Sequence, residues 1–190
     1  MILEGIVTTL GVDGTPNIAP MGPRVEPDMG RFVLRPFRTS TTYRNLERSG
    51  EGVFHVVDDV LLLARAAIGA LRDVATGPAV AVNGVILADA CRHYEFKVSS
   101  IDDSEDRATI YAHTVARGHQ REFFGLNRAK HAVVEAAILA TRVGLLPRSA
   151  ILGDLDRLAP LVAKTGGAAE VEAFALLRDH INGHAILVDP

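Results

Sequence analysis

The hydrophobic pattern of the chain changes once, near Arg121, and this change constrains the fold more than any other feature. Before it, short β-branched segments alternate with turns rich in Gly, Pro and Asp, which predicts strands joined as hairpins. After it, apolar residues recur at helical spacing. The expected helices cover residues 124–143, 155–164 and 168–181. Strands followed by helices favour an α+β or all-β barrel core over residues 1–122, with a helical subdomain over residues 123–190 packed on it.

The β part is expected to form a series of hairpins. Residues 2–10 and 17–22 flank the turn-forming segment Gly11–Pro16, so they form the first hairpin. Asp58 and Asp59 can cap a helix that follows the fourth strand. The other expected strands cover residues 31–36, 52–57, 80–87, 92–99 and 108–116, and short helices cover residues 40–48 and 60–71. The acidic segment Asp102–Asp106 is interpreted as a solvated hairpin turn without a functional role.

Composition and charge exclude several classes of function. The chain has a net charge of −3 and scattered basic residues, so it is not expected to bind nucleic acid. Its one cysteine, Cys91, excludes an internal disulfide and a cysteine-rich zinc site. With no signal-peptide pattern and no apolar stretch of membrane-spanning length, a cytoplasmic protein without a membrane partner is expected. The seven histidines show no convincing ligand spacing, so no metal site is expected.

The densest polar cluster covers residues 35–46, Arg-Pro-Phe-Arg-Thr-Ser-Thr-Thr-Tyr-Arg-Asn-Leu, between a strand and the start of a helix. A phosphate monoester needs such a place, because guanidinium groups, hydroxyls and helix-start amides satisfy its charge and its acceptor oxygens. An ordinary helix cap would also explain the segment, although a cap needs only one of the four consecutive hydroxyls. The segment is no glycine-rich nucleotide loop. Spacing alone leaves both interpretations open.

The same segment, together with Asn17–Gly22 and Phe32–Phe37, resembles the FMN-binding split-barrel superfamily of flavin reductase-like and pyridoxamine-phosphate-oxidase-like proteins. Residues 124–142, Phe-Gly-Leu-Asn-Arg-Ala-Lys-His-Ala-Val-Val-Glu-Ala-Ala-Ile-Leu-Ala-Thr-Arg, are similar to the helix signature of one uncharacterised branch, the domain-of-unknown-function family numbered 447. The resemblance spans essentially the whole chain. It implies an α+β fold, a split β-barrel with a C-terminal helical subdomain, and a homodimer with FMN near the subunit interface.

The resemblance also implies which residues hold FMN. Carried over by loop position, the phosphate would lie among Arg35, Thr39, Ser40, Thr41 and Thr42, with Asn45 steadying the loop. Backbone groups along the edge of the isoalloxazine ring would come from Pro20, Met21 and Gly22. The serine-arginine-lysine phosphate motif of the pyridoxamine-phosphate oxidases is missing, so oxidation of a vitamin B6 phosphate is not expected.

The predicted long helix supports an inference of its own. Arg128, Glu135 and Arg142 are seven residues apart and share one line on the helix, with His131 beside them, while most other positions are apolar. The helix is therefore expected to be buried, and Glu135 to pair with one of these cations or with a cation across an interface. Alternatively, three polar residues of the helix start face the flavin phosphate or an anionic substrate: Asn127, Arg128 and Lys130.

Two functions fit these expectations. The first is a dimeric FMN flavoprotein, an oxidoreductase in which the flavin carries the electron chemistry on a small molecule and no side chain need act as acid or base. No catalytic residue is therefore named. The second is a non-catalytic module that binds FMN or another phosphorylated ligand as a sensor, carrier or docking protein, because related barrels host both roles.

Overall fold

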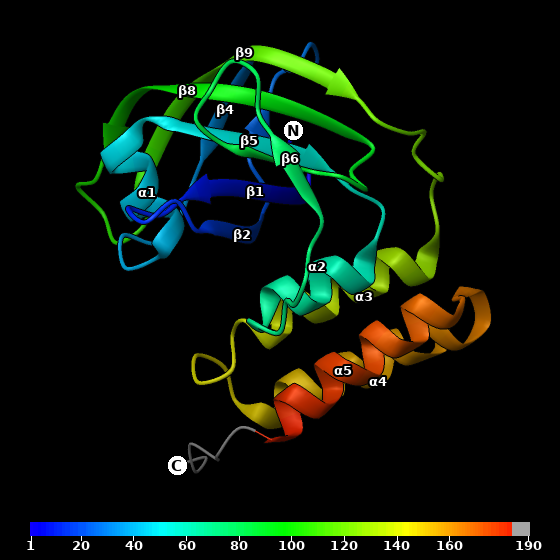
Figure 1. Cartoon of the computed structure of the whole chain (residues 1–190). Helices are drawn as coiled ribbons and strands as arrows, with labels where there is room; N and C mark the ends of the chain where they lie inside the picture. Colours follow the sequence, from blue (N-terminus) through cyan, green and yellow to red (C-terminus); the bar gives the residue numbers. More distant parts are fainter. Residues whose placement is uncertain (184–190) are drawn as a thin grey trace. The chain divides into compact units, whose positions relative to one another are not determined.

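The computed structural model describes residues 1–183, which form two compact units (Figure 1). The first unit combines Met1–Val57 with Asp73–Phe123, and the second combines Asp58–Arg72 with the described residues from Phe124 to Gly183. The segment Asp58–Arg72 thus joins the C-terminal helices, whereas the sequence placed it in the β domain. Among the described residues, no helix is long and apolar enough to cross a membrane.

The first unit contains a seven-stranded antiparallel sheet, a two-stranded sheet and one helix. The strands of the large sheet follow the order β2-β1-β5-β8-β9-β4-β3. These strands are β1 Gly5–Leu10, β2 Pro16–Met21, β3 Arg24–Val25, β4 Arg31–Leu34, β5 Glu51–Val56, β8 Arg92–Asp102 and β9 Thr109–His119. The small sheet pairs β6 Thr76–Pro78 with β7 Val85–Leu87, and helix α1 covers Thr41–Ser49.

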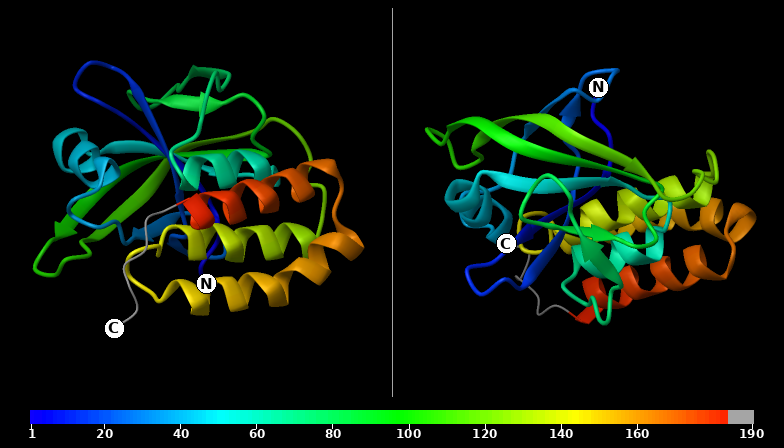
Figure 2. Two further views of the ribbon diagram at one scale, coloured as in Figure 1. Left: turned by 90° about the horizontal axis from the view of Figure 1, so that it is seen from below. Right: turned by 45° about the horizontal axis from the view of Figure 1, so that its top comes forward.

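The large sheet curls until its two ends belong to the same stretch of chain (Figure 2). Residues 16–25 run antiparallel to residues 1–10 without a change of register, because the β1–β2 ladder continues in a bridge between Ile2 and Arg24. The other edge of β3 pairs with β4. Strands β2 and β3 are therefore two halves of one strand. The β3 half pairs with β4 and closes the sheet, whereas the outer edge of β2 stays open and leaves the barrel split.

Aromatic side chains fill the interior of the curled sheet. The ring of Phe32 lies 5.7 Å from that of Phe54 and 5.9 Å from that of Phe96, measured between centroids. Helix α1 packs Tyr43 and Leu46 into the same cluster. Because these side chains are almost fully buried, the start of α1 is fixed on the barrel.

The small sheet is anchored by two buried polar side chains, His55 on β5 and Glu95 on β8. The Nε2 atom of His55 accepts a hydrogen bond from Leu87 N–H at 3.1 Å. The carboxylate of Glu95 accepts hydrogen bonds from three consecutive amides, those of Val80, Ala81 and Val82. Buried polar groups need such partners, so these contacts hold the β6–β7 turn in one position.

The expectation of a single strand over residues 80–87 is wrong in its first part. Only Val85–Leu87 belongs to a strand, and the preceding residues form the turn whose amides bind Glu95. The physical reason is that a carboxylate distant in sequence offers these amides better partners than a strand ladder does. The other expected strands and both short helices are present, with ends that differ by a few residues.

The described part of the second unit contains four helices: α2 Val60–Ala67, α3 Arg128–Ala140, α4 Arg148–Thr165 and α5 Ala168–Gly183. Asp59 caps α2 as expected, since its side chain accepts from the amides of Leu61 and Leu62. One face of α3 forms the centre of the unit. The buried residues of this face are Ala129, Ala132, Val133, Ala136, Ala137 and Ala140.

The expectation that Glu135 is buried in an ion pair is wrong. Helix α3 buries only one face, and Glu135 lies on the exposed side with Arg128, His131 and Arg142. Within residues 1–183, Glu135 forms no ion pair with any of these cations. The buried face consists mainly of alanines, which pack closely against the neighbouring helices. The charged residues lie on the opposite face in water, so Glu135 needs no internal partner.

Candidate functional site

The loop between β4 and α1 ends in a capped helix start. Ser40 is the N-cap, and its hydroxyl accepts a hydrogen bond from Tyr43 N–H at 3.1 Å. In the part of the chain that the structure describes, no hydrogen bond reaches the N–H of Thr41 or Thr42, the first two helical positions. Free amides at the positive end of a helix attract anions. The loop therefore contains the cap and also leaves donors for a ligand.

The threonines of this loop divide into two groups. Thr39 and Thr41 are exposed. Thr42 is buried, and its hydroxyl accepts from Asn17 Nδ2 at 3.1 Å. Asn45 is also buried and donates to a threonine hydroxyl of β1 at 3.0 Å. Thr42 and Asn45 thus fasten α1 to the barrel, and the outer two threonines are the ones open to a ligand.

Two arginines shape the loop. Arg44, which the sequence did not single out, donates from Nη1 to Thr39 O at 2.6 Å and from Nη2 to Thr41 Oγ1 at 3.2 Å. Arg35 pairs through Nη2 with Glu105 at 3.0 Å, while its Nε is buried and has no partner among the described residues. A buried donor without a partner is unfavourable. An anionic oxygen in the loop would satisfy it.

The acidic tip of the β8–β9 hairpin lies against the same loop. Asp103 lies 3.9 Å from Arg38 and accepts from the Tyr43 hydroxyl at 3.2 Å. The hydrogen bond to Glu47, together with burial and Asp103, raises the pKa of Tyr43 to about 12. The sequence correctly indicated a turn over residues 102–106. It did not indicate that the turn's carboxylates compete for the guanidinium groups of the loop.

The candidate ring position lies on the open edge of β2. This edge has no partner strand among residues 1–183, because β2 pairs there with β1 alone and ends the strand order of the large sheet. Leu3 N–H donates to Pro23 O, so by alternation the backbone groups of Gly22 and Pro20 point away from β1. Pro20 lacks an N–H and protects the edge from further pairing. Gly22 N–H and both carbonyls stay available, whereas the backbone of Met21 faces β1.

Strand β2 also connects the open edge with the loop. Asn17 contacts Thr42 at the start of α1, and Pro20 lies three residues further along the strand. A strand rises by about 3.3 Å per residue, so the two positions are roughly 10 Å apart along β2. A ligand with a phosphate at the loop and a ring at the open edge would follow this strand.

The three candidates at the start of the long helix lie in the second unit, and two of them have structural roles. Asn127 caps α3, because its Oδ1 accepts from Lys130 N–H at 3.1 Å. Lys130 Nζ pairs with Glu170 at 2.9 Å and donates to Asp58 O at 2.7 Å. The hydrogen bond from Lys130 holds the pKa of Glu170 below its usual range. Arg128 is exposed and forms no ion pair within the described chain.

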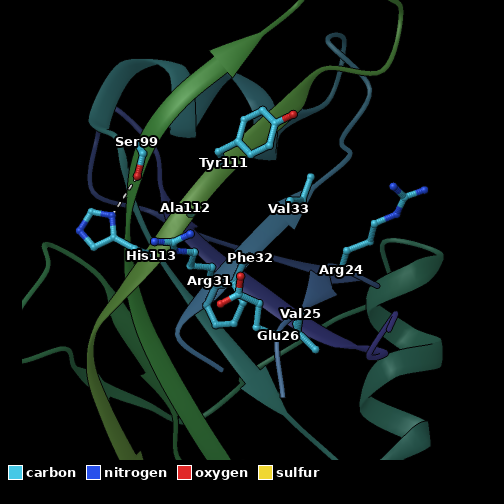
Figure 3. A pocket seen from close by; sticks show the side chains of 10 residues that line it. All are labelled: Arg24, Val25, Glu26, Arg31, Phe32, Val33, Ser99, Tyr111, Ala112 and His113. Atoms are coloured by element: carbon cyan, nitrogen blue, oxygen red, sulfur yellow. Dashed lines mark hydrogen bonds between the residues drawn. The ribbon is translucent and has the colours of Figure 1, made fainter. Parts of the chain in front are cut away.

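A second feature of the first unit is an open hollow of about 640 Å³ on β3, β4 and β9 (Figure 3). Ser99 and His113 meet at its rim, where Ser99 Oγ lies 3.0 Å from His113 Nδ1. Its other polar and aromatic lining residues include Arg24, Glu26, Arg31 and Tyr111. The sequence did not indicate this hollow, since its residues come from separate strands. In residues 1–183, no group of three His, Cys, Asp or Glu side chains gathers as a metal site would require.

Comparison with protein families gives two adjacent matches. Residues 3–121 match the N-terminal domain of the family described as protein of unknown function DUF447. Residues 127–179 match the second domain of the same family description. No curated protein matches the chain. The two matched segments correspond to the strand-rich and helix-rich parts of the sequence, which confirms the predicted family.

Solved structures support the fold. An FMN-bound DUF447 protein from Methanosarcina mazei superposes with a TM-score of 0.82 at 25% identity, covering 94% of each chain. The 2-nitrobenzoate 2-nitroreductase of Pseudomonas fluorescens gives 0.53 at 19% identity, covering 61% of this chain and 64% of its own. Nitrilotriacetate monooxygenase component B of Bacillus cereus gives 0.53 at 17% identity, with coverages of 64% and 71%. The predicted fold, an α+β split β-barrel followed by C-terminal helices, is confirmed.

Proposed function

The chain belongs to the protein family of unknown function DUF447, and from this premise we propose that its first unit binds FMN. The Methanosarcina mazei relative is described as FMN-bound. The observation that carries the proposal for this chain is the loop before α1. Two helix-start amides and two exposed threonines lie there, and Arg35 at the start of the loop has an Nε without a partner among the described residues. This donor set suits the charge and acceptor oxygens of a phosphate monoester.

In the proposed complex, the phosphate occupies the loop at Thr39–Thr42 and the isoalloxazine ring lies by the open edge of β2. Arg35 donates to the phosphate through Nε, while Arg44 keeps the outer threonines in position. Gly22 N–H and the Pro20 carbonyl meet the polar edge of the ring. Bound FMN supplies electron transfer, and the residues of the chain bind and orient it.

A homodimer with FMN near its interface is part of the proposal. Asn127 and Lys130 do not carry this part of the proposal, because both form contacts inside the second unit. Arg128 is the exposed candidate of the three and is proposed to serve the anionic ligand. Sedimentation of the FMN-loaded protein would test the dimer, and a monomer at micromolar concentration would contradict it.

The direct test uses FMN and riboflavin as a matched pair of ligands. We expect the purified protein to be yellow and the flavin-free protein to bind FMN at least about tenfold more tightly than riboflavin, because only FMN offers charge-assisted bonds to the loop. Fluorescence titration measures both affinities. Equal affinities would mean that the phosphate does not bind at the loop. A colourless protein that takes up neither flavin would contradict FMN binding itself.

Thr41→Val is expected to weaken FMN binding about three- to tenfold, since it removes one hydroxyl bond to the phosphate. Thr41 is exposed, so the unfolding midpoint should stay unchanged. The control is Thr76→Val, which alters an exposed threonine of β6. An unchanged affinity for FMN in Thr41→Val would place the phosphate away from this helix start.

Glu105→Gln is expected to tighten FMN binding about two- to fivefold, because an exposed ion pair of this kind is worth up to about 1 kcal/mol. Glu105 holds an Nη of Arg35 at 3.0 Å, and its removal leaves the guanidinium group free for phosphate. The gain should shrink at high salt. Asp89→Asn, which changes another exposed carboxylate of the first unit, serves as the control. Weaker binding in Glu105→Gln would show that the ion pair supports the loop instead of competing with the ligand.

We propose that the bound flavin takes part in a redox reaction on a small molecule. The alternative, a non-catalytic binding module, shares every structural feature described above. Anaerobic mixing of the FMN-loaded protein with NADH and NADPH separates the two, with bleaching of the flavin absorbance as the readout. Reduction by either donor favours the oxidoreductase, and lack of reduction favours the module.

A further inference from the structure

The base of the hollow on β3, β4 and β9 is formed by side chains that are paired across the three strands. Arg24 on β3 pairs with Val33 on β4, and Val33 pairs with Tyr111 on β9. Neighbouring strands lie about 4.8 Å apart, so Val33 lies between an arginine and an aromatic ring that are separated by roughly 10 Å of sheet. Figure 3 shows Val33 between these two side chains. The distance between Arg24 and Tyr111 across Val33 leaves room for one planar ring.

A β-bulge completes the rim on the side of β8. Val98 pairs with Ala112 and Ser100 with Tyr111, so Ser99 is the extra residue of the bulge. Its hydroxyl consequently reaches His113 Nδ1 at 3.0 Å. Bulges commonly redirect side chains beside functional sites. Here the bulge adds a hydroxyl and an imidazole to the hollow.

The hollow is more positive than the chain as a whole. Arg24 and Arg31 are exposed, and neither guanidinium group forms an ion pair or hydrogen bond within residues 1–183. Glu26 is the one carboxylate that lines the hollow, so its fixed charge is positive although the chain carries −3. Arg31 is paired across the sheet with His113, which adds a further donor beside it. These groups complement an anion.

We infer that this hollow binds a planar aromatic anion, a small molecule whose ring lies over Val33 against Tyr111 and whose acidic group faces Arg24 and Arg31. The inference rests on the proposed function, because it names the substrate class of the same flavin site. Arg24 follows Gly22 by two residues, roughly 7 Å along the strand, so the hollow adjoins the proposed ring position. Guanidinium groups bind carboxylates and phosphates through paired bonds.

The test uses salicylate as the probe and salicylamide as its neutral counterpart. The FMN-loaded protein is titrated with each, and amide shifts of Val33, Tyr111 and His113 are followed by NMR. We expect salicylate to shift these amides at millimolar concentration and salicylamide to leave them in place. Arg24→Gln and Arg31→Gln should each weaken salicylate binding about three- to tenfold. The control Arg92→Gln changes an exposed arginine outside the hollow and should bind salicylate as the wild type does.

Three results would overturn the inference: no shifts with salicylate, equal shifts with salicylamide, or unchanged salicylate affinity in both hollow variants. The flavin-free protein is titrated in parallel. If salicylate binds as expected to a chain that takes up no FMN, the proposed cofactor fails while the anion site stands. If FMN binds and salicylate does not, the anion site fails while the proposed cofactor stands.

Discussion

Glu95→Gln is expected to lower the free energy of unfolding of the first unit by about 2–4 kcal/mol. The Glu95 side chain is 1% exposed. Its carboxylate accepts from three amides of the β6–β7 turn, those of Val80, Ala81 and Val82. A glutamine side chain keeps one acceptor oxygen and turns an NH2 group toward donors. The buried amide of Val82 and the partly buried amides beside it then compete for a single acceptor.

Tyrosine fluorescence measures this loss selectively. The chain has three tyrosines and no tryptophan, and all three tyrosines lie in the first unit. Urea unfolding followed at tyrosine emission therefore reports this unit. The control is Glu122→Gln. The Glu122 side chain is 85% exposed, so this variant should unfold at the same urea concentration as the wild type. Equal midpoints for Glu95→Gln and the control would mean that water already reaches the turn amides.

Strands such as β4 and β9 could be predicted because the barrel buries one face and exposes the other. On β4, Phe32 and Leu34 are buried while Arg31 is exposed, and such alternation is visible in a single sequence. The short strand β3 was not expected. Its two residues are extended because they pair with residues 1–3 on one edge and with β4 on the other. Partners so distant in sequence leave no local periodicity.

The candidate site was predictable only in part, and for the same reason. Four consecutive hydroxyl residues before a helix point to a cap or an anion site from the sequence alone. Arg35 contacts Glu105, and Arg38 contacts Asp103. Both pairs join segments that are about seventy residues apart in the chain. Only the closure of β8 and β9 onto β4 brings these charges together.

At the start of the long helix, the structure shows contacts within the chain for two of the three residues that the sequence predicted to face a ligand. Lys130 stands with Asn127 and Arg128 at the polar start of the helix, which drew it into the predicted site. In the structure it satisfies Glu170 and the Asp58 carbonyl inside the second unit. A charged side chain that is partly buried needs a partner, and the sequence does not say whether that partner is a ligand or another helix.

His55→Gln is expected to make the first unit less sensitive to acid. Burial lowers the pKa of His55 to about 3, against an ordinary value of 6.5. Its Nε2 accepts from Leu87 N–H and its Nδ1 contacts Ile6 O at 3.2 Å, so the neutral form with the proton on Nδ1 fits both partners. Because the folded pKa is depressed, the unfolded chain binds a proton first as the pH falls. The stabilisation is complete above pH 6.5 and declines below it.

The size of the effect follows from the width of that window. Each pH unit below 6.5 removes about 1.4 kcal/mol, so the wild type should lose about 2–3 kcal/mol through His55 between pH 7 and pH 4.5. Glutamine can donate to Ile6 O and accept from Leu87 N–H without titrating, so His55→Gln starts less stable and loses less. Urea unfolding at both pH values, followed at tyrosine emission, gives the difference directly.

The comparison isolates His55 because other acid-sensitive groups act equally in both proteins. Glu51, whose pKa is held below its usual range by the Asn83 amide and by Lys97, keeps these contacts in the variant. His113→Gln changes an exposed histidine and should retain the acid sensitivity of the wild type. If His55→Gln lost as much stability with acid as the wild type, His55 would titrate near its ordinary pKa in the folded state. Water would then reach β5 beneath the small sheet, and the Glu95 contacts beside it would be worth correspondingly less.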